Sequence, residues 1–172
     1  MILKRFEINL CLKLISKRFG VIDDNLDHPI GVLKEQGMMA SPATKGIDHI
    51  GLTVRDLAAS KAFFVGALGW EQFGGNPDYP SAYMTDGNAK LTLWECKTDA
   101  FNEFDRHANI GLHHLALKVT SAEELYSVFE AVQNWPGVEV EFAPEFSGKG
   151  PKEHFMVYEP GGTRLEVSFD PR

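Results

Sequence analysis

The feature that most constrains the fold is an internal repeat, in which residues 46–70 and 111–135 match at a constant offset of 65. The first copy reads GIDHIGLTVRDLAASKAFFVGALGW and the second reads GLHHLALKVTSAEELYSVFEAVQNW. Identical pairs without a gap include Gly46/Gly111 and His49/His114. Because self-similarity at a fixed spacing indicates a structural unit used more than once, the sequence predicts two similar modules.

Each copy shows the same succession of secondary-structure signals. Apolar strands are predicted over 47–54 and 112–119, and a helix start follows each of them. Asp56 is a good N-cap for the first helix, and Ser121 with Glu124 three residues later forms a capping-box pattern in the second. Three strand-like segments come after each helix, so each module is predicted as β-α-β-β-β.

These signals predict an α+β fold with one working domain. Residues 46–172 form that domain, in which module one (46–97) and module two (111–170) are joined by a linker (98–110). The two modules are expected to form a curved mixed sheet shaped as a cup. Residues 1–45 are interpreted as an N-terminal extension, either partly disordered or produced by an over-long reading of the start site.

Composition and charge exclude several classes of function. Glu7 and Lys13 interrupt the apolar stretch at the N-terminus, so it matches neither a signal peptide nor a membrane span. The formal net charge of −7 argues against nucleic acid and against an anionic membrane surface as partners. Cys11 and Cys96 form no CxxC motif, which is typical of reduced thiols and predicts a cytoplasmic protein.

Candidate functional residues gather on one face of the predicted strands. One face of each strand is strongly apolar and must cover the helices, while the opposite face carries small and polar residues. His49, His114 and Glu166 fall on this second face, and Glu95 is matched to Glu166 as its counterpart in the first copy. The repeat therefore predicts one histidine and one glutamate from each module on the cup face.

Two imidazoles and two carboxylates form a donor set for a divalent ion such as Zn, Ni, Co, Mn or Fe(II). His49, Glu95, His114 and Glu166 would fill four positions of an octahedral ion and leave two for a substrate or water. The alternative is that each is an ordinary residue, with Glu95 in a salt bridge to Lys90 and His114 hydrogen-bonded in the wall of the cup.

The adjacent histidines in GLHHLAL are expected to differ in role. Neighbouring residues on a strand point to opposite faces, so His113 and His114 are predicted to lie in different environments. His114 aligns with His49 and is the predicted ligand, whereas His113 aligns with Asp48 and is not.

The segments DHIGLTVRDLAASKAFF, LTLWE, HHLALKV and EPGGTRLEVSF, within residues 46–169, resemble the vicinal oxygen chelate superfamily. This superfamily includes glyoxalase I, bleomycin-resistance proteins and extradiol dioxygenases. The resemblance is to the glyoxalase I-like branch, and it implies paired βαβββ modules curled around a metal-holding cup. It also implies a homodimer with its sites near the interface.

The resemblance further implies an activity for this chain. It points to a metal-dependent lyase or isomerase, similar to lactoylglutathione lyase, that moves a proton next to metal-chelated oxygens of a small substrate. Glu166 matches the catalytic base, and Glu95 is a possible second acid or base. In extradiol dioxygenases and fosfomycin-resistance enzymes, only the equivalents of His49, His114 and Glu166 bind the metal.

The chain departs from the glyoxalase I pattern at one position. Thr53 stands where bacterial glyoxalase I usually has the arginine that holds glutathione, which puts a glutathione substrate in doubt. Lys118 and Arg164 lie on the same predicted face and are candidate contacts for a substrate carboxylate or phosphate, and Thr53 is the third candidate substrate contact. The simpler interpretation is that Arg164 pairs with a neighbouring carboxylate and Lys118 reaches water.

Two other functions remain open from the sequence. One is a metal-free, bleomycin-resistance-like protein that binds a small aromatic or cationic molecule, for which Trp70, Tyr79 and Tyr83 are candidate contacts. The other is an Fe(II) extradiol-type dioxygenase, in which Glu95 would take no part.

Overall fold

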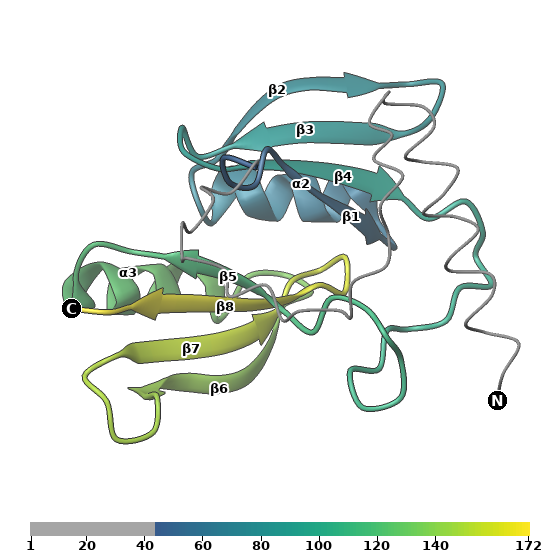
Figure 1. The fold of residues 1–172 in the computed structure, drawn as a ribbon. Helices are drawn as coiled ribbons and strands as arrows, with labels where there is room; N and C mark the ends of the chain where they lie inside the picture. Colours follow the sequence, from purple (N-terminus) through teal and green to yellow (C-terminus); the bar gives the residue numbers. More distant parts are fainter. Residues whose placement is uncertain (1–43) are drawn as a thin grey trace, which may run out of the picture. The chain divides into compact units, whose positions relative to one another are not determined.

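Two four-stranded sheets with the same strand order form the framework of the described residues, 44–172 (Figure 1). In this computed structural model, sheet A has the order β1 (Ile50–Val54), β4 (Lys90–Glu95), β3 (Ser81–Thr85), β2 (Glu71–Asn76). Sheet B has the order β5 (Leu115–Lys118), β8 (Arg164–Phe169), β7 (Glu153–Tyr158), β6 (Glu139–Phe146). β1 pairs with β4 and β5 with β8 in parallel, and the other pairs are antiparallel. The predicted α+β fold of two βαβββ modules is confirmed.

The predicted N-terminal extension, including Cys11, lies outside the described residues apart from its last two positions. Within residues 44–172, no helix is long and apolar enough to cross a membrane.

Both opening strands begin three residues later than predicted. β1 starts at Ile50 and β5 at Leu115, so His49 and His114 each lie directly before a strand rather than within it. This matters for the site, because strict alternation of side chains holds only within a strand.

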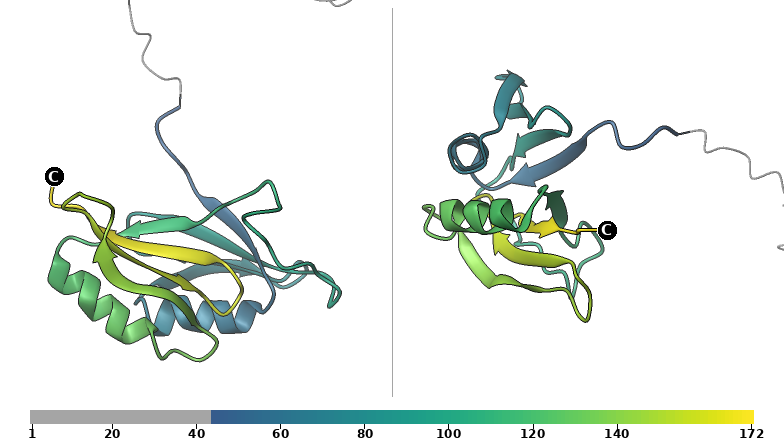
Figure 2. Two further views of the ribbon diagram at one scale, coloured as in Figure 1. Left: turned by 90° about the horizontal axis from the view of Figure 1, so that it is seen from below. Right: turned by 90° about the vertical axis from the view of Figure 1, so that its left-hand side faces the viewer.

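The two helices begin at the predicted caps. The side chain of Asp56 accepts a 2.8 Å hydrogen bond from the backbone N–H of Ala59 and starts α2 (Leu57–Gly66). Ser121 accepts a 3.1 Å hydrogen bond from the N–H of Glu124 and starts α3 (Ala122–Val132). Both helices lie on the same side of the sheets (Figure 2, left).

The apolar faces of both sheets are buried under these helices. Leu52 and Val54 of β1, and Leu165 and Val167 of β8, are buried as the alternation predicts. One continuous cluster of buried residues includes side chains from both modules. Burying each large apolar side chain stabilises the folded state by about 1.5–3 kcal/mol. Because both modules contribute such side chains to one cluster, this core holds the modules together.

Polar contacts reinforce the junction between the modules. The backbone N–H of Arg55, after β1, donates a 3.1 Å hydrogen bond to the carbonyl of Gly161 in the β7–β8 turn. Gly161 packs so closely on Ser60 and Val54 that a Cβ atom there would overlap both. The ring of Phe63 in α2 lies edge-on to Trp135, with centroids 6.3 Å apart. The end of β1 is therefore fixed against the last hairpin of module two.

Candidate functional site

A cluster of polar side chains surrounds Glu166 on the face of sheet B opposite the core. Glu166 lies in the middle of β8 and is only 6% exposed. His114 Nε2 lies 3.1 Å from Glu166 Oε2. Lys152 Nζ lies 2.7 Å and His154 Nδ1 2.9 Å from Glu166 Oε1. The structure thus brings together His114 and Glu166, as predicted, and adds two residues to them.

Strand register explains how these side chains meet. Ala116 of β5 pairs with Glu166, and His114, which directly precedes β5, lies close enough to reach its carboxylate. His154 pairs with Ser168, the next residue of β8 on the face of Glu166. Lys152 directly precedes β7. Two chain segments, at the starts of β5 and β7, therefore converge on the carboxylate of Glu166.

Glu166 is held in its anionic form. Burial by itself would raise the pKa of Glu166, but the hydrogen bonds from Lys152 and His154 outweigh it and leave the pKa below its ordinary value. A buried carboxylate that is ionised at neutral pH, with imidazoles on either side, has the chemistry of a ligand for a divalent ion of borderline hardness. The ammonium of Lys152 competes for the same carboxylate.

The two adjacent histidines touch each other but lie in different surroundings: His114 reaches Glu166, whereas His113 lies beside Arg164 and lines a separate cleft. His113 Nδ1 and His114 Nδ1 lie 2.8 Å apart, and the rings meet edge-on. The two rings can still touch because they lie before β5, which begins only at Leu115. Burial, and then the charge of Arg164, lower the pKa of His113, so His113 is neutral and can accept a hydrogen bond from His114.

Module one lacks a carboxylate at the position that corresponds to Glu166. Gly51 is the counterpart of Ala116 in the repeat, and its partner on β4 is Thr92, not Glu95. Glu95 instead pairs with Val54, at the far end of β4. The predicted match between Glu95 and Glu166 is therefore wrong, because the parallel register of β1 and β4 places Thr92 at the position of Glu166.

His49 and Glu95 lie apart from each other in module one. His49 directly precedes β1 and is the counterpart of His114, but its side chain is 52% exposed and its Nδ1 lies 2.8 Å from Asp48. Glu95 ends β4, where its backbone N–H donates to the carbonyl of Pro80. In residues 44–172, no three or more histidine, cysteine, aspartate or glutamate side chains are arranged to hold a metal ion.

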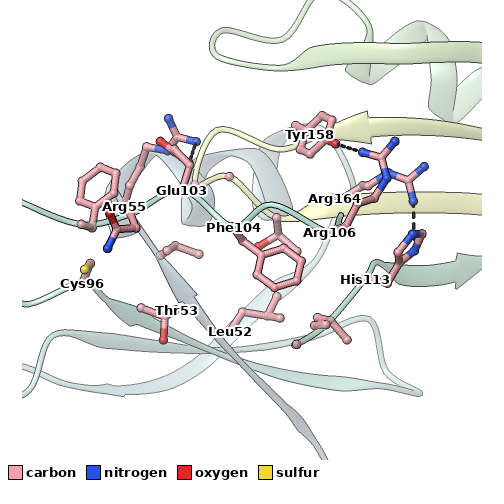
Figure 3. A pocket seen from close by; sticks show the side chains of 18 of the residues that line it. Leu52, Thr53, Arg55, Cys96, Glu103, Phe104, Arg106, His113, Tyr158 and Arg164 are labelled. Carbon is pink, nitrogen blue, oxygen red and sulfur yellow. Dashed lines mark hydrogen bonds and ion pairs between the residues drawn. The ribbon is translucent and has the colours of Figure 1, made fainter. Parts of the chain in front are cut away.

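The three candidate substrate contacts lie in different surroundings. Arg164 is engaged by Glu141, to which its Nε donates at 2.6 Å, so the simpler interpretation describes it. Lys118 is exposed at the end of β5. Thr53 and Arg164 both line a cleft of about 430 Å³, seen in Figure 3.

The sequence places His154 at the rim of the predicted cup, but neither His154 nor Lys152 is among the predicted site residues. His154 could have been found by extending the alternation along β7, because Phe155 and Val157 are buried and His154 faces the other way. Lys152 follows the turn 147–151 and has no periodic signal, so only the folded chain reveals its position.

The aromatic residues considered for ligand binding divide between core and surface. Trp70 is 5% exposed and packs edge-on against Phe64, so it belongs to the core. The rings of Tyr79 and Tyr83 both lie near Trp94, with centroids 4.8 Å and 6.3 Å away. Sheet A therefore carries an aromatic cluster of Tyr79, Tyr83 and Trp94 outside the core.

Comparison with known proteins gives one family. The model of the Glyoxalase/Bleomycin resistance protein/Dioxygenase superfamily matches residues 46–167. No curated protein matches the chain.

Solved structures with a similar fold include several proteins from bacteria. A possible glyoxalase from Bacillus cereus has a TM-score of 0.57 and 25% identity over 73% of this chain and 100% of that chain. A glyoxylase/bleomycin resistance protein/dioxygenase domain from Frankia sp. EAN1pec has a TM-score of 0.64 and 24% identity over 74% of this chain and 98% of that one. The fosfomycin resistance protein FosX from Listeria monocytogenes has a TM-score of 0.57 and 21% identity over 73% of this chain and 93% of that one. At these identities the last two show the fold alone.

Proposed function

Because the chain belongs to the glyoxalase, bleomycin resistance protein and dioxygenase superfamily, we propose that it is a metal-dependent enzyme that acts on a small oxygenated substrate. One observation carries this proposal: His114 Nε2 and Glu166 Oε2 approach to 3.1 Å on the face of sheet B opposite the core. An imidazole and an ionised, buried carboxylate at this distance supply two ligands of a borderline divalent ion such as Zn, Ni, Co, Mn or Fe(II).

The proposed ligand set contains three residues of the four expected from the sequence. His114 and Glu166 lie together, and His49 is the counterpart of His114 in module one by the repeat. Thr92 stands where a fourth, carboxylate ligand would come from module one, which favours a set of two histidines and one glutamate. A role for Glu95 stays a prediction.

We propose that a homodimer completes the site. His49 is half exposed and lies on the module that carries the aromatic cluster, whose Tyr79 is also exposed. If sheet A of one copy covers sheet B of a second copy, His49 can approach the His114–Glu166 pair. Sedimentation at several concentrations of the full chain tests this, and a monomer at all of them would contradict it.

The chain's own residues suit the transfer of a proton. A bound divalent ion would supply a Lewis acid that stabilises negative charge on neighbouring substrate oxygens. Glu166 is the proposed proton acceptor, and the hydrogen bonds from Lys152 and His154 fix the orientation of its carboxylate. The ammonium of Lys152 can also offset negative charge that develops on the substrate.

Metal analysis of the purified full chain tests the proposal. We expect about one equivalent of divalent metal per binding site after incubation with Zn, Ni, Co, Mn or Fe(II) and desalting. His114→Ala should abolish this uptake. His107→Ala, which removes an exposed histidine of the linker between the modules, should retain it. An assay panel of hemithioacetals and acyl-CoA epimers then tests the reaction. Failure of the wild-type chain to take up any metal would overturn the proposal.

The three-ligand set also fits a second candidate, the Fe(II) extradiol-type dioxygenase. Two histidines and one carboxylate with open positions are typical of non-haem Fe(II) oxygenases. Oxygen consumption by the Fe(II)-loaded chain with catechols would favour this activity over proton transfer.

Metal-free binding of a small molecule is a third candidate, and two observations favour it. Lys152 already neutralises Glu166 at 2.7 Å, and Tyr79, Tyr83 and Trp94 form an aromatic surface. Quenching of tryptophan fluorescence by a planar aromatic cation, unchanged by chelators, would support this function.

A further inference from the structure

The cleft in Figure 3 is a second candidate site, distinct from the cluster at Glu166. It has a volume of about 430 Å³, within the range of small-molecule sites. Its walls are β1 from Gly51 onward, the connector between the modules (residues 96–113), the last residue of β7, the β7–β8 turn and the first residue of β8. None of the four side chains of the metal-site cluster (His114, Lys152, His154 and Glu166) lines it.

One end of the cleft holds more positive than negative charge. Arg106 and Arg164 both bind the carboxylate of Glu141, with NH2–Oε1 distances of 3.1 Å and 3.0 Å. The side chain of Arg164 is only 10% exposed, and those of Arg106 and Glu141 are 24% exposed. Two guanidinium groups with one carboxylate leave one positive charge in excess at a partly shielded position, where it can attract an anionic ligand.

Further donors lie at the same end. Arg106 NH1 donates a 2.7 Å hydrogen bond to the hydroxyl oxygen of Tyr158, which leaves the hydroxyl hydrogen of Tyr158 to donate elsewhere. Figure 3 shows Tyr158 beside Arg106 and Arg164, with His113 at the edge of this group. Arg106, Arg164 and Tyr158 thus offer N–H and O–H donors to the two oxygens of one carboxylate.

The middle of the cleft is apolar and incompletely covered. Phe101, Phe104, Ile110 and Leu112 line the cleft, and all four remain exposed. The ring of Phe104 lies against Gly111, where a Cβ atom would overlap it, so this glycine lets the connector fold closely over the cleft. An apolar body placed here would bury surface that now faces water.

The other end of the cleft is electrically balanced. Arg55 NH2 lies 2.9 Å from Glu103 Oε2, and both side chains are well exposed. This exposed pair contributes little to attraction of an anion, since surface ion pairs are weak and each charge has its partner. The unbalanced charge is therefore confined to the end with Arg106 and Arg164.

We propose that this cleft binds a small amphiphilic carboxylate, whose acid group contacts Arg106, Arg164 and Tyr158 and whose apolar body lies between Phe104 and Leu112. Guanidinium groups match a carboxylate in geometry and charge, and Glu141 already occupies part of this arginine pair in the same way. The site needs no metal and adds an anion-binding function to the chain.

Calorimetric titration of the full chain in the presence of EDTA tests the proposal. Phenylacetate is the probe, and phenylacetamide is its neutral control. We expect phenylacetate to bind and the amide to bind at least about tenfold more weakly, because charge-assisted hydrogen bonds are lost. Arg106→Gln should weaken phenylacetate by a similar factor. Arg172→Gln removes the same charge from an exposed pair with Asp170 and should change the affinity by less than about twofold.

Glu141→Gln provides a readout that misfolding cannot mimic. It removes the internal anion that competes for the arginines, so phenylacetate should bind several-fold more tightly. Absence of phenylacetate binding in the millimolar range, equal binding of acid and amide, or unchanged or weaker binding by Glu141→Gln would each overturn the proposal.

Discussion

The hydroxyl of Ser60 donates a 2.8 Å hydrogen bond to the carboxylate of Glu159, which joins α2 of module one to the β7–β8 turn of module two. Glu159 is 1% exposed. Its other hydrogen bonds come from the backbone N–H groups of Gly161 and Thr163 in its own turn. Ser60 is therefore the donor that ties this buried carboxylate to the other module.

Ser60→Ala should destabilise the chain by about 1–3 kcal/mol, because it leaves a buried carboxylate oxygen short of a donor. Urea unfolding of the full chain, followed by circular dichroism, measures the change in free energy of unfolding. Ser127→Ala removes a hydroxyl from an exposed position of α3 and should change the same quantity by less than about 0.5 kcal/mol. An equal effect of the two variants would show that the Ser60 contact does not hold the junction.

Lys152→Gln should tighten the binding of divalent metal to the chain. The ammonium of Lys152 lies 2.7 Å from Glu166 Oε1 and repels a cation that approaches the same carboxylate. Removing one charge at this distance from a partly buried site should raise affinity by about threefold to tenfold. Calorimetric titration with Zn(II) measures this, and Lys149→Gln, an exposed lysine of the neighbouring turn, serves as the control. A weaker affinity in Lys152→Gln would mean that the lysine supports the site instead.

Glu95→Gln should leave metal affinity within about twofold of the wild type, because Thr92 rather than Glu95 corresponds to Glu166. Glu166→Gln is the matched comparison, since the same change at the proposed ligand should lower affinity by more than about tenfold. A large loss of affinity in Glu95→Gln would restore the four-ligand set that the sequence predicts.

The repeat was sufficient to predict the modules but not the relation between their sites. Helix starts at Asp56 and Ser121 depend on local side-chain to backbone hydrogen bonds, and such signals are readable in sequence. The position of Glu95 depends instead on the parallel register of β1 and β4. Parallel strands joined by a long connection have no tight turn that fixes their register. The sequence therefore did not reveal that Thr92, three residues before Glu95, is the residue that corresponds to Glu166.

The same distinction applies to the polar clusters. His114 and Glu166 could be paired from the sequence because both lie at or beside apolar strands of recognisable period. Arg106, in contrast, comes from the connector, where no periodicity predicts which residues fold back. Its contacts with Tyr158 and Glu141 follow from tertiary packing alone.

The pair of Glu141 and Arg164 should make stability depend on pH in the acid range. The hydrogen bond from Arg164 lowers the pKa of Glu141 below its ordinary value of 4.5, more than burial raises it. A carboxyl with a lowered folded pKa stabilises the folded state above its unfolded pKa, and this contribution is lost as pH falls through the folded pKa. We therefore expect the wild type to be more stable than Glu141→Gln at neutral pH, by about 0.5–1.5 kcal/mol.

This advantage should stay constant down to about pH 4.5 and shrink below it, because Glu141 takes up a proton in the unfolded state first, and it should be gone once Glu141 is protonated in the folded state too. Urea unfolding of both proteins at a series of pH values measures the difference. Glu139→Gln changes an exposed carboxyl of the same strand and should give a smaller difference over the series. The difference in free energy of unfolding between the wild type and Glu141→Gln could instead stay unchanged below pH 4.5. That result would show that packing of the Glu141 side chain, rather than its charge, causes the difference.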